Sequence, residues 1–265
     1  MISRAERTAS YALLCLFAAF ALYPLLMILT VAWQSESTDV AGGFGNFADA
    51  WRIGHFGDYL KNSVIVSATV VAAATVLSVL AGYAFGTMRF IGANALFYLL
   101  LLGLMVPTEA IVIPLYFDFR SLHLTHTYAS IVLPQVAQSL AFGTFWMRTY
   151  FRSSSREVVE AARLDGAGHW RTLWHVLLPM GRPALLTMML LVFMWTWNEF
   201  LIPLVMGGED LATAPLGLSL FQGQHTSGTT LLAAGAVLVA LPIVVVYIFL
   251  QRYFIRGMLE GAVKG

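Results

Sequence analysis

The chain carries one compact group of charged and small residues, which lies between two long apolar segments. The group reads Glu-Ala-Ala-Arg-Leu-Asp-Gly-Ala over residues 160–167. Paired charges can orient a partner protein, and small side chains let it approach closely. These residue types therefore indicate a docking surface for a soluble protein rather than a catalytic centre. Its candidate docking residues are Glu157, Glu160, Ala161, Ala162, Arg163, Asp165, Gly166 and Ala167.

The residue patterns of common catalytic and metal sites do not occur in the sequence. A phosphate-binding loop needs a Gly-Lys pair, but the two lysines, Lys61 and Lys264, follow Leu60 and Val263. The single Cys15 excludes an internal disulfide and a cysteine-built zinc site. His123 and His126 are three residues apart and are either a metal pair or, as we expect, solvated loop residues. We therefore expect no enzyme activity and no metal site in this chain.

The composition is that of a membrane protein. Hydrophobic residues make up 59% of the 265 residues and charged residues only 11%, which is about half the charged fraction of an ordinary soluble domain. The formal net charge of +1 leaves no broad basic face for a nucleic acid. The chain is therefore expected to lie in a lipid bilayer and to bind no nucleic acid.

Long apolar stretches recur along the chain. A helix needs about 20 apolar residues to cross the hydrocarbon core, and backbone exposed to lipid must satisfy its own hydrogen bonds. The sequence therefore predicts an all-α membrane protein, with residues 1–265 forming one domain of six spanning helices and a short polar helix between the fourth and fifth spans. The predicted spans are residues 11–33, 63–88, 91–116, 127–147, 183–206 and 231–253, and the polar loop is 148–182.

The basic residues are distributed unevenly between the two ends of these spans. Twelve of the 15 lysines and arginines fall on the side of the termini and the polar loop, and only Arg52, Lys61 and Arg120 fall on the other side. Lysine and arginine concentrate in cytoplasmic loops. Both termini and the 148–182 loop are therefore predicted to be cytoplasmic.

The polar loop has the signals of a short helix. Ser154 and Glu157 have the spacing of a capping box, which predicts a helix start near Ser155. Gly166 predicts the helix end, because glycine readily adopts the left-handed conformation found there. The alternative to docking is that this helix lies on the inner leaflet with its arginines on lipid phosphates.

The loop also resembles a known motif. It reads Glu-Ala-Ala, three residues, Gly, nine residues, Val, one residue and Leu-Pro, from Glu160 to Pro179. This pattern resembles the signature loop by which permease subunits of ATP-binding-cassette (ABC) importers seat in a groove of their ATPase, with Val176 in place of the usual Ile. The resemblance implies that the candidate docking residues form a coupling helix that contacts an ATPase subunit.

Further motifs extend the resemblance over nearly the whole chain. They look like those of the smaller permease subunit of the maltose transporter and of its carbohydrate-uptake relatives, which implies an importer of a sugar or a related polyol. The motifs are Pro114-Leu115-Tyr116, Leu124, Thr127-Tyr128, Trp195, Trp197-Asn198-Glu199-Phe200, Gln251-Arg252-Tyr253-Phe254, Gly257, Gly261 and Val263-Lys264-Gly265.

The same resemblance implies a set of partners. They are a second, different permease chain, two ABC ATPase subunits that bind ATP and magnesium, an extracytoplasmic solute-binding protein, the sugar or polyol, and membrane lipid. This chain itself would hold no cofactor. It would lie as a multi-pass protein in the cytoplasmic (inner) membrane of a bacterium or archaeon.

Two acidic residues, Glu109 and Glu199, lie inside predicted spans, where charge is costly and therefore often functional. At about 1.5 Å of rise per residue, both fall near the outer ends of their spans. With Asn198 they offer acceptors to sugar hydroxyls, and Trp195 or Trp197 offers a ring for an apolar sugar face. These five residues are candidates for the solute pathway, the alternative being an ordinary interfacial belt.

Two other features bear on the pathway. Pro107 and Pro114 interrupt the third span and predict a kink, which either lines the pathway or serves only packing. The outer loop from Gly207 to Gly228 either reaches into the cleft of the binding protein, as the resemblance implies, or is a mobile connection.

Two other functions are compatible with the spans. A secondary carrier driven by an ion gradient would use Glu109 or Glu199 as its ion site, but neither acid has a basic partner within the spans and the sequence shows no inverted halves. A structural or channel component would explain the spans but not the polar loop. The sequence therefore favours an ATP-driven importer, in which the loop transmits closure of the ATPase pair to the fourth and fifth spans.

Overall fold

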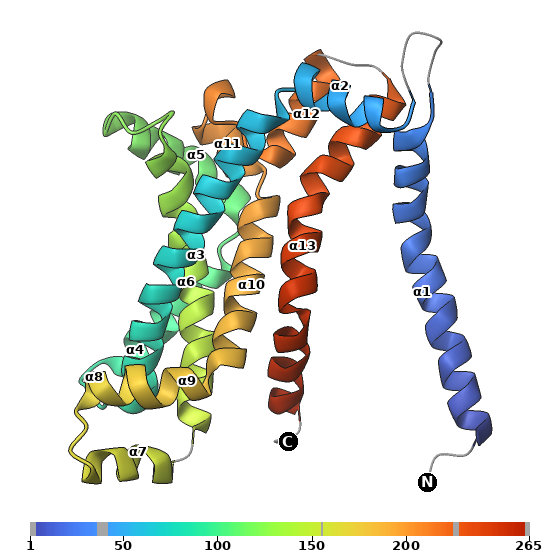
Figure 1. Cartoon of the computed structure of the whole chain (residues 1–265). Coiled ribbons are helices and arrows are strands. Elements are labelled where there is room, and N and C mark those ends of the chain that lie inside the picture. The colour runs from blue at the N-terminus through green and yellow to red at the C-terminus, as the bar shows by residue number, and fades with distance from the viewer. Residues whose placement is uncertain (1–3, 36–41, 155, 225–227, 263–265) are drawn as a thin grey trace. The chain divides into compact units, whose positions relative to one another are not determined.

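The structure is a computed structural model, traced in Figure 1, that describes residues 4–35, 42–154, 156–224 and 228–262. Every element formed by these residues is helical, so the predicted all-α class is confirmed for the part described. In order the elements are α1 (Arg4–Trp33), α2 (Phe44–Ile53), α3 (Phe56–Thr87), α4 (Ala93–Met105), α5 (Thr108–Ser121), α6 (Tyr128–Ser153), α7 (Arg156–Leu164), α8 (His169–Thr172), the π-helix η1 (Leu173–Leu177), α9 (Leu178–Met180), α10 (Arg182–Asn198), α11 (Leu201–Met206), the 3-10 helix η2 (Glu209–Leu211), α12 (Ala214–Gln224) and α13 (Thr229–Ala262).

The chain divides into two compact units. One comprises Met1–Asp58 and Gly217–Leu241, and the other Tyr59–Leu216 and Pro242–Gly265. In the first unit, the buried Asn46 of α2 donates hydrogen bonds to the carbonyls of Ala32 and Gln34 at 2.9 and 2.8 Å, which fixes α2 to the end of α1. All the candidate docking and pathway residues lie in the second unit.

The length and composition of the helices agree in part with the predicted spans. Three of the described helices are long and apolar enough to cross a membrane alone, and two bent pairs raise the number to five if each pair is one span. The fourth predicted span, 127–147, corresponds to α6, which has 26 residues but buries polar side chains such as Gln135 and Thr144. A count of six spans therefore stays a prediction. The three single helices are Glu6–Trp33, Phe56–Thr87 and Thr229–Tyr253.

The third predicted span is broken at the first of its two prolines. α4 ends at Met105, α5 begins at Thr108, and their axes differ by 99°. Val106 is extended, because a residue that precedes proline is pushed out of the helical conformation. Pro114, in contrast, lies inside α5 without ending it. The predicted interruption is therefore made by Pro107 alone.

The core of the second unit is built around α6, against which α4, α10 and α11 pack. Met147 and Phe151 of α6 are buried with Tyr83 of α3 and with Leu173 and Leu177 of η1. The rings of Tyr83 and Phe151 meet edge to face with their centroids 5.6 Å apart. This cluster joins the segment that follows α7 to two of the long helices.

Candidate functional site

The short helix α7 presents most of the candidate docking residues on its surface. Glu157, Glu160, Ala161, Arg163 and Asp165 are exposed, and the structure gives no ion pair between Glu160 and Arg163. These side chains are therefore accessible to a partner. Of the neighbouring residues on α7, Ala162 is buried and Leu164 is 89% exposed.

Gly166 ends α7 as the sequence predicts. Its φ is +78°, in the left-handed region. Its N–H donates to the carbonyl of Arg163 at 3.0 Å, and the N–H of Ala167 donates to the carbonyl of Ala162 at 2.9 Å. This pair of bonds is the Schellman motif, which satisfies the last helical carbonyls and turns the chain sharply. The turn sets the direction in which α7 projects.

The predicted capping box at Ser154 is wrong. The Ser154 hydroxyl donates to the carbonyl of Tyr150 at 3.0 Å, and its N–H bonds to the same carbonyl at 3.1 Å. Ser154 is thus the C-terminal cap of α6 and not the first cap of α7, which begins at Arg156. The hydroxyl is occupied by the preceding helix because α6 runs six residues past the predicted end of its span, to Ser153.

Residues 169–180, which we call the lever helix, connect α7 to α10. The lever helix comprises α8, η1 and α9, and it meets α10 at an angle of 80°. Leu173, Leu177 and Leu178 bury its inner face in the core. The hydroxyl of Tyr83 lies 3.0 Å from Nδ1 of His169, which ties the start of the lever helix to α3. π-helical turns such as η1 are rare and occur often at functional sites.

Two aromatic side chains of α6 hold the junction between the lever helix and α10. The Tyr150 hydroxyl donates to the carbonyl of Leu177 at 2.8 Å, and the Trp146 indole donates to the carbonyl of Ala184 at 2.9 Å. A Cβ atom at Gly181 would overlap the Tyr150 ring, so only glycine allows this approach. Figure 1 shows α10 rising from the end of α9 beside α6. A displacement of the lever helix must therefore act on α10.

Four of the five predicted pathway residues line one cavity, which has a volume of about 600 Å³. It lies at the break between α4 and α5 and at the C-terminal end of α10. Glu109, Trp195, Asn198 and Glu199 contribute to its wall. Trp195 is half exposed and its ring contacts Phe142 edge to face, with centroids 4.6 Å apart.

Trp197 lies outside this cavity. Its side chain is 1% exposed, and its ring packs against Phe193 with centroids 5.5 Å apart. Residues 195 and 197 are separated by about 200° around a helix, so they face opposite sides of α10. The structure thus assigns Trp197 to packing and leaves Trp195 as the aromatic residue available to a solute.

Glu199 has a local structural partner that the sequence pattern does not reveal. α10 ends at Asn198 and α11 begins at Leu201, and Oε1 of Glu199 accepts the N–H groups of Leu201 and Ile202 at 2.9 and 3.0 Å. The carboxylate therefore caps the new helix start. Glu109 lies in the first turn of α5, another helix start made by a break, where a negative charge is favourable.

The cavity also includes amide side chains from α6 that were not among the predicted pathway residues. Gln135 and Gln138 line it, and Nε2 of Gln138 donates to Oγ1 of Thr108 at 2.8 Å. Two glutamines three residues apart share a helix face, and polar residues in a span are functional candidates. That spacing within 127–147 is the signal that could have found them.

The arrangement suits binding of a hydroxylated solute. The cavity offers carboxylates, amides and one exposed indole, and the part of the chain that the structure describes contains no cluster of three or more residues able to hold a metal ion. Sugars present hydroxyls to such acceptors and an apolar ring face to such an indole.

Comparisons with known proteins identify relatives along nearly the whole chain. A family model described as "Binding-protein-dependent transport system inner membrane component" matches residues 74–260. The probable ABC transporter permease protein YurM of Bacillus subtilis is 33% identical, over 97% of this chain and 89% of its own. The arabinooligosaccharides transport system permease protein AraQ of Halalkalibacterium halodurans is 32% identical over 94% of each chain. The trehalose transport system permease protein SugB of Mycobacterium tuberculosis is 31% identical, over 98% of this chain and 99% of its own.

Solved structures show the same fold. A chain of a bacterial ABC transporter involved in the import of the acidic polysaccharide alginate superposes with a TM-score of 0.76 and 26% identity, over 96% of this chain and 99% of that one. A second chain comes from a bacterial alginate ABC transporter in complex with a periplasmic protein that holds an alginate pentasaccharide. It has a TM-score of 0.71 at 14% identity and supports the fold alone.

Proposed function

The chain belongs to the family of binding-protein-dependent transport system inner membrane components, and we propose that within this family it is the permease subunit of an importer for a sugar or a related polyol. Membership makes it a permease of the ABC importer type. It is therefore not a secondary carrier driven by an ion gradient. Helix starts stabilise both carboxylates that such a carrier would have used.

The proposed substrate class is supported by relatives and by the cavity. Relatives of about 30% identity are named for transport of arabinooligosaccharides, diacetylchitobiose and trehalose. The cavity wall, with Glu109, Glu199, Asn198 and Trp195, matches the hydrogen-bonding and stacking needs of such solutes. We therefore place the outer part of the solute pathway along this wall.

The proposed partners are a second permease chain, two ABC ATPase subunits and an extracytoplasmic solute-binding protein. An ATPase dimer has two docking grooves, whereas this chain has one α7. A second membrane subunit is therefore needed to occupy the other groove. We place the assembly in the cytoplasmic membrane of a bacterium or archaeon, with α7 and both termini in the cytoplasm.

The observation that carries the proposed mechanism is the continuous mechanical path from α7 to the cavity. α7 leads into the lever helix, which is fixed to α3 and α6 and is joined by Tyr150 and Trp146 to the start of α10. The 17 residues of α10 reach about 25 Å at 1.5 Å per residue and end at Asn198 in the cavity wall. Closure of the ATPase pair would move α7, and α10 would carry the displacement to the cavity.

The proposal is tested by purifying the tagged chain with its native partners and reconstituting the complex into proteoliposomes. We expect an ABC ATPase to co-purify, and oligosaccharides or polyols, presented with the binding protein, to stimulate ATP hydrolysis and uptake. Amino acids and inorganic phosphate serve as control solutes. Uptake without ATP under a proton gradient, or stimulation by amino acids but by no sugar, would contradict it.

A further inference from the structure

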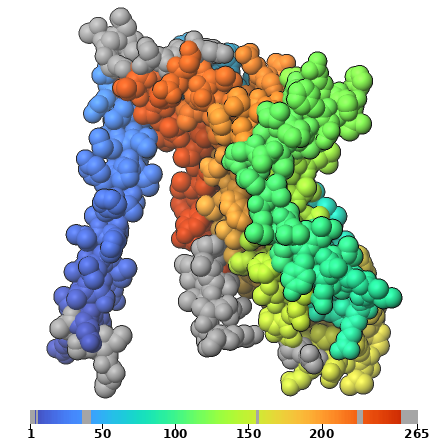
Figure 2. All heavy atoms as spheres, turned by 180° about the vertical axis from the view of Figure 1, so that it is seen from behind, coloured from blue at the N-terminus to red at the C-terminus, as the bar shows by residue number. Residues whose placement is uncertain are grey.

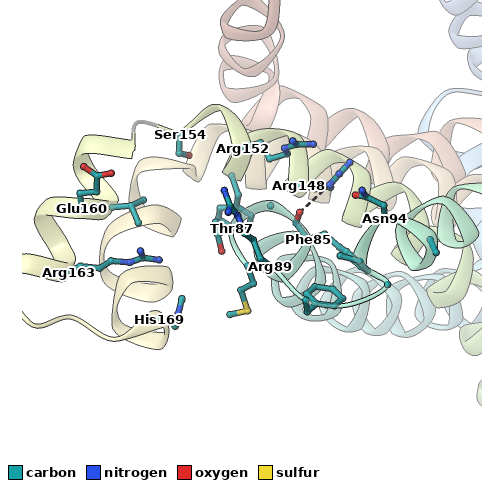
Figure 3. Close-up of a pocket in the computed structure, with 18 residues that line it drawn as sticks. Phe85, Thr87, Arg89, Asn94, Arg148, Arg152, Ser154, Glu160, Arg163 and His169 are labelled. Carbon is teal, nitrogen blue, oxygen red and sulfur yellow. Dashed lines mark hydrogen bonds between the residues drawn. The ribbon is translucent and has the colours of Figure 1, made fainter.

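A second, larger cavity of about 1080 Å³ lies away from the proposed solute pathway. Its wall is formed by the end of α3, the connection to α4, the end of α6, and α7 (Figure 3). We call it the arginine pocket, because four arginines from these different elements line it. They are Arg89, Arg148, Arg152 and Arg163.

The described residues give the arginine pocket an excess of positive charge. Glu160 is the one carboxylate in its wall, and within the described ranges none of the four arginines forms an ion pair. In Figure 3 the Arg163 side chain extends toward the middle of the pocket, whereas the Glu160 carboxylate points to its edge. Like charges held together without a counter-charge attract an anion.

Arg148 is the most constrained of the four arginines. Its Nε donates to the carbonyl of Phe85 at 3.3 Å, and its guanidinium lies 3.7 Å from the centre of the Phe97 ring. It lies one residue past the predicted span 127–147. Partial burial lowers the pKa of Arg148, and the positive charge of Arg152 lowers it further. Both effects are unfavourable to the charged form, and the attraction of a bound anion would offset them.

The edge of the arginine pocket is apolar and uncovered. Phe90 and Ile91 are exposed beside Arg89, and Leu96 and Leu99 on the next turns of α4 are exposed as well. Figure 2 shows α4, in teal, at the surface of this face of the unit. The predicted spans end at Met88 and Met147 and restart at Ile91, so in the proposed orientation the arginines would lie at the level of the inner lipid headgroups.

We propose that the arginine pocket binds the phosphate of an anionic phospholipid of the inner leaflet, whose acyl chains lie along the exposed face of α4. Guanidinium groups bind phosphate oxygens in pairs, and basic pockets between spanning helices on the cytoplasmic side suit anionic headgroups. An acidic surface of a partner ATPase could meet the same charges. It would make no use of the apolar face of α4, so the lipid is the better fit.

A lipid in this position would bridge three separate elements of the chain. One phosphate between Arg89 of the connection, Arg152 of α6 and Arg163 of α7 would hold α7 against the ends of the long helices. Transmission through α7 would then depend on anionic lipid. This dependence on lipid rests on the proposed role of α7 and not on the identity of the solute. A negative result would therefore leave the proposed substrate class unchanged.

The test uses the complete complex in nanodiscs of phosphatidylcholine that contain a small fraction of photoreactive phosphatidylglycerol, with the labelled peptides identified by mass spectrometry. We expect labelling within residues 85–99 of the wild type. The variant R89Q/R152Q removes two charges, and each charge is worth a factor of about five in the affinity for an anionic lipid. Half-maximal labelling of this variant should therefore need about thirty times more phosphatidylglycerol than the wild type. The matched control R182Q removes an exposed arginine outside the pocket, and its labelling should match the wild type.

Further measurements keep the test decisive. Assembly of R89Q/R152Q with its partners is checked by size-exclusion chromatography. If the variant does not assemble, the salt dependence of wild-type labelling replaces it, since labelling must fall as ionic strength rises. Equal labelling of wild type and R89Q/R152Q, or labelling that does not change with salt, would overturn the proposal. So would displacement by soluble glycerol phosphate, or the absence of labelling within residues 85–99 of the complete complex.

Discussion

The turn at Gly166 allows a graded test of how α7 must be held. With φ at +78°, an alanine would pay about 1–2 kcal/mol for the left-handed conformation, whereas asparagine tolerates it better. Proline fixes φ near −65° and removes the N–H that bonds to Arg163, at a cost of about 3 kcal/mol or more. A Cβ at this position meets no atom beyond the neighbouring residues within 4 Å, so the cost comes from the local backbone conformation alone.

Since about 1.4 kcal/mol changes an equilibrium tenfold, G166A should lower the population of correctly projecting α7 by roughly a factor of ten. G166N should lose less than G166A, and G166P should abolish function. The assay is solute-stimulated ATP hydrolysis and uptake by the reconstituted complex, with the amount of assembled complex measured for each variant. We expect normal amounts in membranes and a graded loss of activity.

Gly168 supplies the matched control. It lies two residues further on, and a Cβ atom there would also meet open space, but its φ is −71°. G168A should therefore behave as the wild type. If G166A and G168A had the same activity, or if G166N were worse than G166A, the left-handed turn would not be what positions α7.

Other substitutions separate the parts of the mechanical path and the cavity. Y150F removes the hydroxyl that bonds to the Leu177 carbonyl, worth about 1 kcal/mol, and should lower solute uptake per ATP hydrolysed; an unchanged ratio would argue against this joint. E199A should lower the free energy of unfolding by about 1 kcal/mol, because the N–H groups of Leu201 and Ile202 lose their acceptor. E199Q keeps an acceptor oxygen and should lose less. Equal melting temperatures of the two variant complexes would refute the capping role. W195A should reduce solute uptake while the amount of protein in the membrane stays normal. W197A should reduce the amount of folded protein, because emptying a buried tryptophan site costs about 3–5 kcal/mol. Uptake assays and membrane immunoblots measure the two effects, and the reverse outcome would exchange the roles of the two residues.

The features that could be predicted from sequence are those set by local chemistry. Gly166 ends a helix because of its own backbone freedom, and Pro107 breaks one because of its ring and its effect on Val106. The distribution of apolar residues was sufficient for the all-α class. In each case the physical cause acts within a few residues, so the pattern alone carries it.

The features that could not be predicted depend on where neighbouring elements end. Ser154 has the spacing of a helix-starting cap, but α6 extends to Ser153 and takes its hydroxyl. Trp195 and Trp197 look equivalent in a polar-aromatic motif and differ only in the side of α10 that they occupy. Glu199 gains its two N–H partners only because the chain starts a new helix at Leu201, although Pro203, which cannot bond to the Glu199 carbonyl, is a local signal for the break itself.

Crosslinking from α7 in the intact assembly would decide whether this helix transmits the action of an ATPase. Ala161, which is exposed on α7, would be replaced by a photoreactive phenylalanine derivative, with exposed Leu204 on α11 as the control position. Position 161 should crosslink to an ATPase subunit with a yield that changes on addition of ATP, and position 204 should not. Crosslinks from position 161 only to lipid or to an extracytoplasmic protein would contradict the proposed role of α7.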